Sequence, residues 1–315
     1  MTGALPTDDA VTLLDPERWD QRVRDHAPLL PFAALHWLRL GLRGDPRLRL
    51  LPLELRTEEG HHLLVPVVRT PDGQAQIGCY GYGTLCPASE EKPRVAPGFR
   101  GLAARIGAAA GGAAGVRTLL PPRGLVPRLE PWVGEWPARP GPTTHLLDLS
   151  QGSAAAWEAA RGSVRTAVRR ARDAGLRAVA ASGRHAPVLA ALHHETLDRN
   201  GGASAYTAQD LHVLAARDAV SSVVEDGSGT VQAATVFALG AATGYHLMQL
   251  TSAQGRRTNA GHLAFWSALE ELERRGARRV DLGSAAGAGQ ERFKRHWGAV
   301  PAATRLVSTT REGER

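Results

Sequence analysis

The sequence predicts a mixed α/β fold that consists of two similar modules in tandem. The same pattern (a strand, a turn rich in acidic residues and glycine, and a second strand) occurs once in each half, about 170 residues apart. A short stretch with seven prolines separates the two occurrences. With 315 residues, the chain is long enough for two domains of ordinary size.

The first occurrence is a predicted β-hairpin in the N-terminal half. Residues 47–56 (RLRLLPLELR) and 61–69 (HHLLVPVVR) are rich in apolar side chains over the length of a strand. The intervening residues 57–60 (TEEG) have the composition of a turn. These three segments predict two antiparallel strands.

The seven prolines lie between residues 121 and 142. Proline at that density disfavours a helix or a central strand, because it lacks a backbone N–H, so we expect a semi-rigid connector on the surface. The boundary is therefore placed near residue 143. It divides the chain into an N-terminal module, 1–142, and a C-terminal module, 143–315, whose last strand is a candidate to pack on the first module.

Two helices are predicted in the C-terminal half. The first covers residues 154–175 and ends at a glycine, which is typical of a helix C-terminus. The second covers residues 261–275, where Phe265, Leu269 and Leu272 recur at i, i+4 and i+7 and predict a buried stripe.

The other predicted elements of this half are strands and one helical turn. Residues 220–225 and 230–239 flank an acidic glycine turn (DGSG), and a third strand follows at 245–250. The elements after the second helix are a strand at 278–282, a helical turn at 290–297 and a closing strand at 303–308.

The composition is that of a folded protein with an excess of positive charge. Hydrophobic residues make up 43% and charged residues 22% of the chain. The formal net charge is +7 and the pI is about 10.2, which favours a polyanionic partner such as nucleic acid or an anionic small substrate. A basic surface without such a partner explains the excess equally well, so charge alone does not decide.

The cysteines and the apolar segments indicate the compartment. Cys79 and Cys86 are too few for a disulfide framework or a zinc site, and a reducing cytoplasm is the natural environment. Residues 1–15 carry acids and lack the apolar run of a signal peptide. No stretch reaches the roughly 18 apolar residues that span a bilayer. We therefore expect a cytoplasmic protein with no membrane span.

Lysine is rare in this chain. Of the 38 basic residues, only Lys92 and Lys294 are lysines. In a chain so strongly biased toward arginine, a lysine indicates a position where an ammonium is wanted rather than a guanidinium.

Residues 252–266 (SAQGRRTNAGHLAFW) lead from a predicted strand into a predicted helix. The N–H groups at such a helix N-terminus suit a phosphate. The segment resembles the coenzyme A loop of the GNAT family, Arg/Gln-x-x-Gly-x-Gly/Ala: Arg256 and Gly261 match, whereas Asn259 replaces the first glycine. Asparagine tolerates the left-handed backbone of that position, but its side chain takes up space where a phosphate would approach. A simple helix cap at Asn259 is the alternative.

Residues 278–298 (RRVDLGSAAGAGQERFKRHWG) closely resemble the Fem family and its GNAT relatives, whose second module ends with roughly "fDlG" and then "FK" before an aromatic residue and glycine. Upstream, residues 164–176 (VRTAVRRARDAGL) fit the arginine-rich helix of that family. The resemblance spans residues 143–310, and the first half fits more loosely. It implies tandem GNAT-like modules, each a mixed central sheet flanked by helices. The matching residues are Asp281, Leu282, Gly283, Phe293, Lys294, Trp297 and Gly298.

The Fem resemblance implies that an acceptor amine attacks the ester that links an amino acid to tRNA. Negative charge then develops on the carbonyl oxygen, and loss of a donor that stabilises it typically costs about 10²–10³ in rate. In the Fem family the lysine of "FK" has this role, which carries over to Lys294, with Phe293 packed beside it as an apolar wall. An exposed lysine on a surface turn is the alternative.

An arginine stripe is predicted on the first helix of the C-terminal module. Its members recur at i, i+4, i+8 and i+11, and apolar positions between them face the core. Such a stripe suits the phosphates of a tRNA acceptor end or of a phosphorylated acceptor, whereas a solvated helix face is the alternative. The stripe consists of Arg161, Arg165, Arg169 and Arg172, with Val164, Val168 and Ala171 toward the core. The other candidate substrate-binding or tRNA-binding residues are Arg256, Arg257, Asn259, Gly261, Tyr80 and Tyr82.

No general base is obvious in the sequence. An α-amine with a pKa near 8 is partly neutral in the cell and can attack without one. Asp281 and Glu195 are the candidates, although Asp281 also fits a structural role at a strand end. The pairs at 61–62 and 193–194 are histidines that lack the spacing of metal ligands, so we expect no metal and no cofactor besides the co-substrate.

Three functions are compatible with these patterns. The first is an aminoacyl-tRNA-dependent transferase that acts on the amine of a small or peptide-like acceptor, such as a specialised metabolite or a peptidoglycan precursor. The second is an N-acyltransferase that uses an acyl-coenzyme A, against which Asn259 argues. The third is an inactive RNA-binding relative. The basic charge and the arginine stripe favour the first.

Overall fold

The computed structural model divides into two compact units. Unit 1 comprises Met1–Pro142 together with Ala303–Arg315, and unit 2 comprises Thr143–Ala302. The residues that the structure describes are 11–26, 29–43, 45–57, 59–79, 81–83, 85–87, 92–199, 206–211 and 219–310. Within these ranges, no helix is both long enough and apolar enough to cross a membrane.

Unit 1 contains a mixed sheet with the strand order β1–β2–β3–β4–β6–β13, and β5 pairs with β3. Only β4 and β6 are parallel neighbours among its described strand pairs. The strands are β1 (Val11–Leu13), β2 (Arg49–Arg56), β3 (His62–Arg69), β4 (Ala75–Ile77), β5 (Cys86–Pro87), β6 (Val116–Leu120) and β13 (Val300–Ser308). The helices are α1 (Pro16–Asp25), α2 (Leu35–Leu42), α3 (Phe99–Ala109) and α4 (Glu130–Val133).

The predicted hairpin of residues 47–69 is confirmed. Strands β2 and β3 pair antiparallel in one continuous register, from Arg49 opposite Arg69 to Arg56 opposite His62. Gly60 closes the turn with φ +84°, a backbone conformation that favours glycine. One apolar core of the unit packs α1 and α2 against β3, and its buried members are Leu14, Trp19, Val23, Ala33, Leu35, Leu38, Leu64 and Cys86.

The prediction that the proline-rich stretch has no helix or strand was wrong. Helix α4 lies inside it, with Pro131 in the first turn, where the missing N–H costs nothing. Strand β7 (Ala138–Asp148) includes Pro140 and Pro142. Because these two prolines are two residues apart, their missing N–H groups fall on the same edge of the strand, and the other edge remains competent to pair.

The last strand of the chain is tied into unit 1 by a buried ion pair. Residues 305–308 of β13 pair antiparallel with β6. The guanidinium of Arg305 donates to both carboxylate oxygens of Glu130, at 3.1 and 2.8 Å, and its Nε donates to Pro121 O at 3.0 Å. This bidentate contact holds β13 against the proline-rich stretch.

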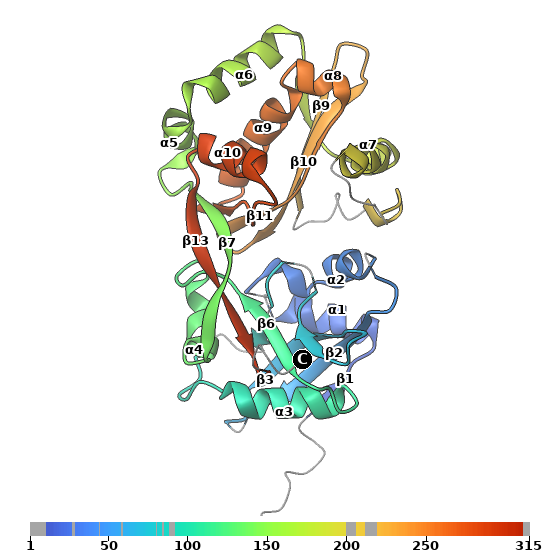
Figure 1. Cartoon of the computed structure of the whole chain (residues 1–315), viewed down its shortest axis with the longest axis vertical. Helices are drawn as coiled ribbons and strands as arrows, with labels where there is room; N and C mark the ends of the chain where they lie inside the picture. Colours follow the sequence, from blue (N-terminus) through green and yellow to red (C-terminus); the bar gives the residue numbers. More distant parts are fainter. Residues whose placement is uncertain are drawn as a thin grey trace, which may run out of the picture. The chain divides into compact units, whose positions relative to one another are not determined.

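Unit 2 has a mixed sheet in the order β7–β12–β11–β10–β9–β8. Helices α5, α6, α9 and α10 lie on one side of strands β9–β11, and α7 lies on the other (Figure 1). The strands after β7 are β8 (Arg177–Ala180), β9 (Ala219–Glu225), β10 (Val231–Gly240), β11 (Thr243–Thr251) and β12 (Arg279–Asp281). The helices are α5 (Gly152–Ala159), α6 (Gly162–Asp173), α7 (Ala186–Arg199), α8 (Ala253–Arg257), α9 (Ala260–Arg274) and α10 (Ala288–His296).

The long helix predicted over residues 154–175 is two helices. Between α5 and α6, Ala160 has the extended backbone angles φ −65° and ψ 145°. The N–H of Arg161 donates to His296 O at 2.9 Å, a partner in α10 that is distant in sequence. Gly162 follows, and glycine has a low helix propensity. A tertiary hydrogen bond at a weak point of the sequence therefore breaks the helix.

The predicted helix of residues 261–275 is confirmed as α9, which forms the centre of unit 2. Phe265, Leu269 and Leu272 are fully buried, as the apolar stripe predicts. The helix packs against β9 and β10, and Gly244 of β11 allows the side chain of Leu272 to approach the sheet closely. The core of unit 2 therefore lies between this helix and the sheet.

Strands β11 and β12 are parallel neighbours that pair over a short length. They pair as far as Tyr245 and Asp281, where β12 ends, whereas β11 continues to Thr251. A bulge between His246 and Met248 interrupts the pairing of β11 with β10. A bulge bends its strand and changes the direction of the side chains beside it. The second half of β11 is therefore free of β12, and α10 follows the end of β12 along the chain.

Candidate functional site

Lys294 lies on α10, shielded from solvent, with 6% of its surface exposed. Its Nζ donates to Gly283 O at 2.8 Å and to Ser284 O at 2.6 Å, both in the loop between β12 and α10. Two accepting carbonyls satisfy two of the three ammonium hydrogens, and one donor remains for another acceptor. The alternative of an exposed lysine on a surface turn is therefore wrong.

Two opposing effects act on the pKa of Lys294. Burial lowers the pKa of Lys294 to about 8, while the nearby carboxylate of Asp281 raises it. Burial and the charge of Lys294 lower the pKa of His246 on β11 to about 4. At neutral pH the site therefore holds a protonated lysine beside a neutral imidazole.

Asp281 ends β12 and is 2% exposed. Its Oδ1 accepts hydrogen bonds from Thr144 Oγ1 and from the backbone N–H of Gly283, the latter at 2.8 Å. These donors stabilise the ionised carboxylate and occupy it. The contacts favour the structural role of Asp281 over that of a general base.

Phe293 precedes Lys294 and joins it to an aromatic cluster. Its ring lies 5.2 Å from Phe265 and 5.5 Å from His262, measured between centroids. Trp297, fully buried, lies 4.8 Å from Phe265. The cluster packs Phe293, the residue next to Lys294 in the chain, against the core of unit 2.

The segment between β11 and α9 keeps the predicted turn. Asn259 has φ +59°, the left-handed conformation that asparagine tolerates. It stands at the N-cap position of α9, yet its side chain makes no capping hydrogen bond. A Cβ on Gly261 would lie 2.9 Å from Thr251 Oγ1, so glycine is needed for the helix to approach β11 this closely. The short helix α8 precedes the turn, and Ser252 is its N-cap.

The candidate cations of this segment are engaged locally. The guanidinium of Arg256 donates to Thr251 O at 2.9 Å and lies 3.5 Å from Glu195 of α7. Arg257 donates to Gln254 Oε1 at 2.9 Å. Glu195 is therefore an exposed partner of Arg256, on the other side of the sheet from Lys294, rather than a neighbour of that ammonium.

The four arginines of the predicted stripe have different environments. The apolar positions between them are buried as predicted. Arg165 donates to three backbone oxygens at the end of α5, at 2.8 to 3.2 Å, which makes it a helix C-cap. Arg169 lies over the ring of Trp157, at 5.8 Å from its centroid. Arg161 and Arg172 are exposed.

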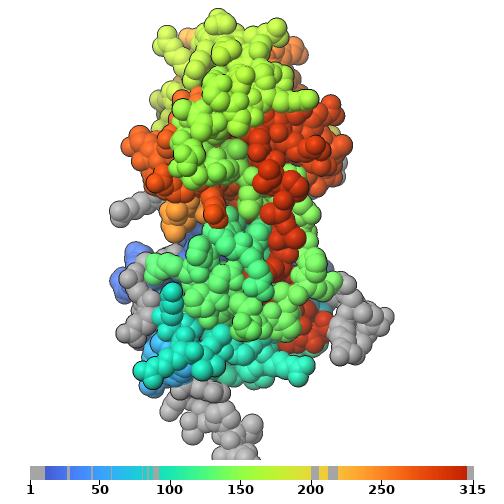
Figure 2. Space-filling view, turned by 90° about the vertical axis from the view of Figure 1, so that its left-hand side faces the viewer, coloured from blue at the N-terminus to red at the C-terminus, as the bar shows by residue number. Residues whose placement is uncertain are grey.

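A basic patch that the sequence analysis did not single out surrounds the start of α6 and the end of α10. Arg161 donates to His296 Nε2 at 2.9 Å, and the charges of Arg161, Arg292 and Arg295, after burial, lower the pKa of His296. Helices α6, in yellow-green, and α10, in orange-red, lie on the face shown in Figure 2. In an arginine-rich sequence, nothing distinguishes Arg292 and Arg295 from other arginines except their place next to Lys294.

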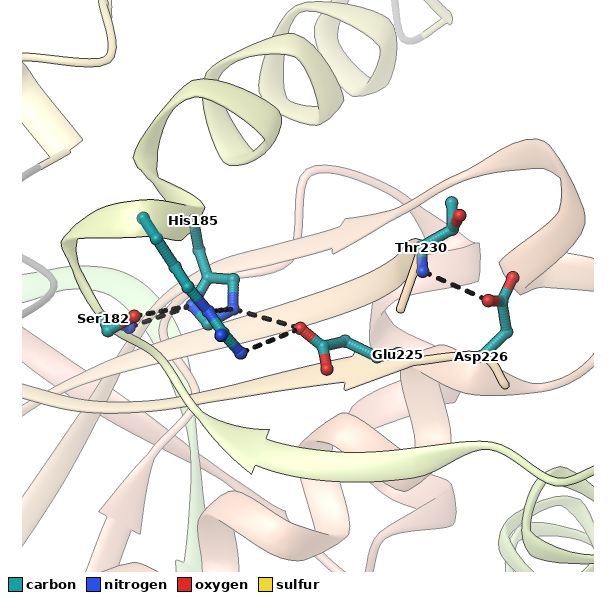
Figure 3. Close-up of polar contacts among 6 residues, drawn as sticks. Ser182, His185, Glu225, Asp226 and Thr230 are labelled. Atoms are coloured by element: carbon teal, nitrogen blue, oxygen red, sulfur yellow. Dashed lines mark hydrogen bonds and ion pairs between the residues drawn. The ribbon is translucent and has the colours of Figure 1, made fainter. Parts of the chain in front are cut away.

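The start of α7 is anchored to the end of β9 (Figure 3). The N–H of Ser182 donates to His185 Nδ1 at 3.0 Å, and His185 Nε2 lies 3.2 Å from Glu225 Oε1. Ser182 Oγ is 3.4 Å from the same Nδ1. The Ser–His–Glu order is that of a hydrolase triad, but the backbone N–H already occupies the imidazole acceptor. The cluster is therefore a capping box that fixes α7 on the β9–β10 hairpin, whose turn is held by Asp226 and Thr230 (Figure 3).

The two candidate tyrosines lie in unit 1, and the histidine pairs lie one in each unit. Tyr82 is buried, with 6% of its surface exposed, and Tyr80 lies outside the described residues. The histidine pairs have ordinary partners: His62 lies 3.0 Å from Glu54, and His193 stacks on Tyr206. In the part of the chain that the structure describes, no three His, Cys, Asp or Glu side chains are grouped as metal ligands.

Comparisons with known proteins identify the fold. The sequence profile of the GNAT acetyltransferase domain matches residues 158–295. The structure of FemX has a TM-score of 0.61 at 11% identity, and the match covers 94% of this chain and 96% of that chain. The structure of L-PGS from Bacillus licheniformis has a TM-score of 0.58 at 12% identity, and the match covers 96% of this chain and 94% of that chain. A tandem GNAT protein from the clavulanic acid biosynthesis pathway has a TM-score of 0.51 at 13% identity, and the match covers 96% of this chain and 99% of that chain.

The chain has a Fem-like tandem GNAT fold. The predicted fold class is thereby confirmed. No curated protein sequence matches the chain.

The matched GNAT acetyltransferase domain contains most of the candidate residues. It includes α6, the turn at Asn259, and α10 as far as Arg295. Lys294 and Phe293 therefore lie at the end of the matched GNAT domain, whereas Tyr82 lies in the other unit of the tandem.

Proposed function

We propose that this protein transfers an aminoacyl group from aminoacyl-tRNA to the amine of a small or peptide-like acceptor, forming an amide. The observation that carries the proposal is the shielded ammonium of Lys294, with one hydrogen left for an oxyanion. The Fem resemblance of residues 278–298 and the fold similarity to FemX support the same reaction. A specialised metabolite or a peptidoglycan precursor is the acceptor class we expect.

In this reaction the lone pair of the acceptor amine forms a C–N bond to the ester carbonyl carbon. The carbonyl electron pair moves onto oxygen, and the resulting oxyanion accepts a hydrogen bond from Lys294 Nζ. When the carbonyl re-forms, the C–O bond to the ribose breaks. The former amine nitrogen loses a proton to solvent, and the ribose oxygen takes a proton from solvent and leaves as the hydroxyl of the tRNA. A preorganised cation in a shielded site is effective because it needs no reorganisation as the charge develops.

The basic patch of Arg161, Arg292 and Arg295 supports a polyanionic donor. These side chains are exposed: Arg161 is the N-cap of α6, and Arg292 and Arg295 lie on α10, the helix that carries Lys294. Arginine donors suit phosphate oxygens, and binding that neutralises phosphates weakens steeply with salt. We expect the phosphates of the tRNA acceptor end to bind at this patch.

The proposal is tested with purified protein, charged tRNA and a panel of amines. We expect release of uncharged tRNA together with an amide product, at a rate that falls as salt is raised. Treatment of the charged tRNA with ribonuclease should abolish the product, and turnover that survives the treatment would contradict the proposal.

An acyl-coenzyme A donor is the second candidate, and it is favoured by the GNAT profile and by the left-handed turn before α9. Against it, the side chain of Asn259 stands at the glycine position of the phosphate loop. Release of free thiol from acetyl-coenzyme A in the presence of the same amines would support this donor instead.

Turnover is expected to fall as the pH rises above about 8. The reason is that the pKa of Lys294 is lowered to about 8, so the ammonium is lost above that pH, by roughly tenfold per unit. A pH profile of kcat measures this limb. The variant Lys294→Arg keeps its charge to much higher pH, so its residual activity should lack the limb.

Unfolding does not account for this limb. Because the folded pKa of Lys294 lies below its usual value of 10.5, the unfolded state binds more protons between pH 8 and 10.5. The contribution of this group to stability therefore rises with pH in that window. Circular dichroism at pH 9 should show an intact fold, and a wild-type profile that stays flat to pH 10 would contradict the role of the ammonium.

A further inference from the structure

The loop between β12 and α10 is held from two sides. On one side, Lys294 Nζ donates to Gly283 O and Ser284 O. On the other side, the carboxylate of Asp281 accepts the N–H of Gly283 at 2.8 Å. Gly283 itself has φ +71°, so the backbone turns sharply between the two contacts. The carboxylate and the ammonium thus bind the same residue from opposite ends of the loop.

Asp281 is in turn fixed in place. It belongs to β12, between β11 and β7, and accepts a hydrogen bond from Thr144 Oγ1 of β7. The next residue, Leu282, donates its N–H to His145 O at 2.8 Å. A residue whose strand is paired on both edges, and whose carboxylate is also bound by the neighbouring strand, is a rigid reference point for the loop.

The charged and titratable groups around the ammonium are few. Asp281 on β12 raises the pKa of Lys294. His246 on β11 is neutral, and Tyr245 beside it has its pKa raised by burial and by Asp281, so it is also uncharged. The carboxylate of Asp281 is therefore the negative charge that the described residues place against Lys294.

We propose that Asp281 is a positioning residue that sets both the place and the protonation of the Lys294 ammonium through the Gly283–Ser284 loop. The carboxylate orients Gly283, Gly283 and Ser284 orient Nζ, and the negative charge keeps the buried nitrogen protonated. Its relevance to turnover rests on the proposed function, but the state of Lys294 is a property of the protein alone. Asp281 does not take a proton from the acceptor amine.

The test measures Lys294 directly. The chain has two lysines, Lys92 and Lys294, so protein grown with [ε-¹³C]lysine gives two side-chain NMR signals to titrate. In the wild type, the Lys294 signal should titrate near pH 8. The variant Lys92→Arg removes one signal and assigns the other.

In Asp281→Asn, the shape is kept and the negative charge is lost. We expect the Lys294 signal to titrate at a pH lower by roughly one unit, the scale of a nearby opposite charge. The alkaline limb of kcat should move by the same amount, with little change in KM for the charged tRNA. The matched control is Thr144→Val, which removes a hydrogen bond to the same carboxylate but leaves the charge. Thr144→Val should lower the free energy of unfolding, but it should move neither the titration of the Lys294 signal nor the alkaline limb of kcat.

The outcomes separate the two proposals. An unchanged Lys294 titration in folded Asp281→Asn overturns the positioning role. A titration that moves equally in Thr144→Val overturns it as well, because the effect would then be structural. If the NMR shift occurs as expected but no tRNA-dependent transfer is found with any amine, the proposed function fails while the positioning role stands.

Discussion

Replacing Lys294 by alanine is expected to lower kcat about 10²–10³-fold. The ammonium is 6% exposed and already oriented by two backbone carbonyls, so its loss removes a preorganised donor that water cannot replace well. The KM for charged tRNA should change little, because the exposed arginines of α10 remain. Single-turnover transfer from charged tRNA is the measurement.

The chain offers a matched control for this change. Lys92 is the other lysine, and it is exposed in unit 1. Lys92→Ala therefore removes the same charge from the protein and should leave kcat unaffected. Equal effects of the two substitutions on kcat, or full activity of folded Lys294→Ala, would contradict the role proposed for the Lys294 ammonium.

Replacing Trp297 by alanine is expected to lower the free energy of unfolding of unit 2 by about 3–5 kcal/mol. The indole is fully buried and stacks on Trp266 at 6.3 Å between ring centroids, with Phe265 at 4.8 Å. Its removal leaves a cavity next to α9, which the rigid packing of helix against sheet cannot refill. Urea denaturation followed by circular dichroism measures the loss.

Trp297→Phe is the control for this second substitution. It keeps an aromatic ring against Phe265 and should cost much less than alanine. Because Trp297 is the C-cap of the helix that carries Phe293 and Lys294, the alanine variant should also lose activity at temperatures where the phenylalanine variant retains it. A urea midpoint of Trp297→Ala within error of the wild type would contradict the central place of this residue in the core.

Much of the fold was predictable from local sequence. The hairpins and α9 have strong periodicity and clear turns, so pattern and structure agree. The break between α5 and α6 was not predictable, because it depends on a hydrogen bond from Arg161 to His296. The strand through Pro140 and Pro142 was missed because composition does not tell on which edge a strand pairs.

The candidate site was predictable in part. The rarity of lysine and the "FK" motif singled out Lys294, whereas its burial follows from contacts with the loop after β12. Helical spacing predicted that Arg165 shares a helix face with the other arginines of the stripe. It did not predict that the hydrogen bonds of Arg165 cap the C-terminus of α5. The grouping of Arg161 with Arg292 and Arg295 arises from two helices far apart in sequence, which no local pattern reports.

The pairing of β13 with β6 bears on how the protein is made. A ribosome releases the N-terminal segment first, yet the strand that completes the sheet of unit 1, with Arg305 as the partner of Glu130, is translated only after all of unit 2. Until then the edge of β6 has no partner from this strand, and a nascent chain with an open edge is prone to mispairing. Unit 2 is contiguous in the sequence, so it can fold as soon as it is synthesised, whereas unit 1 is completed only after unit 2 has been translated.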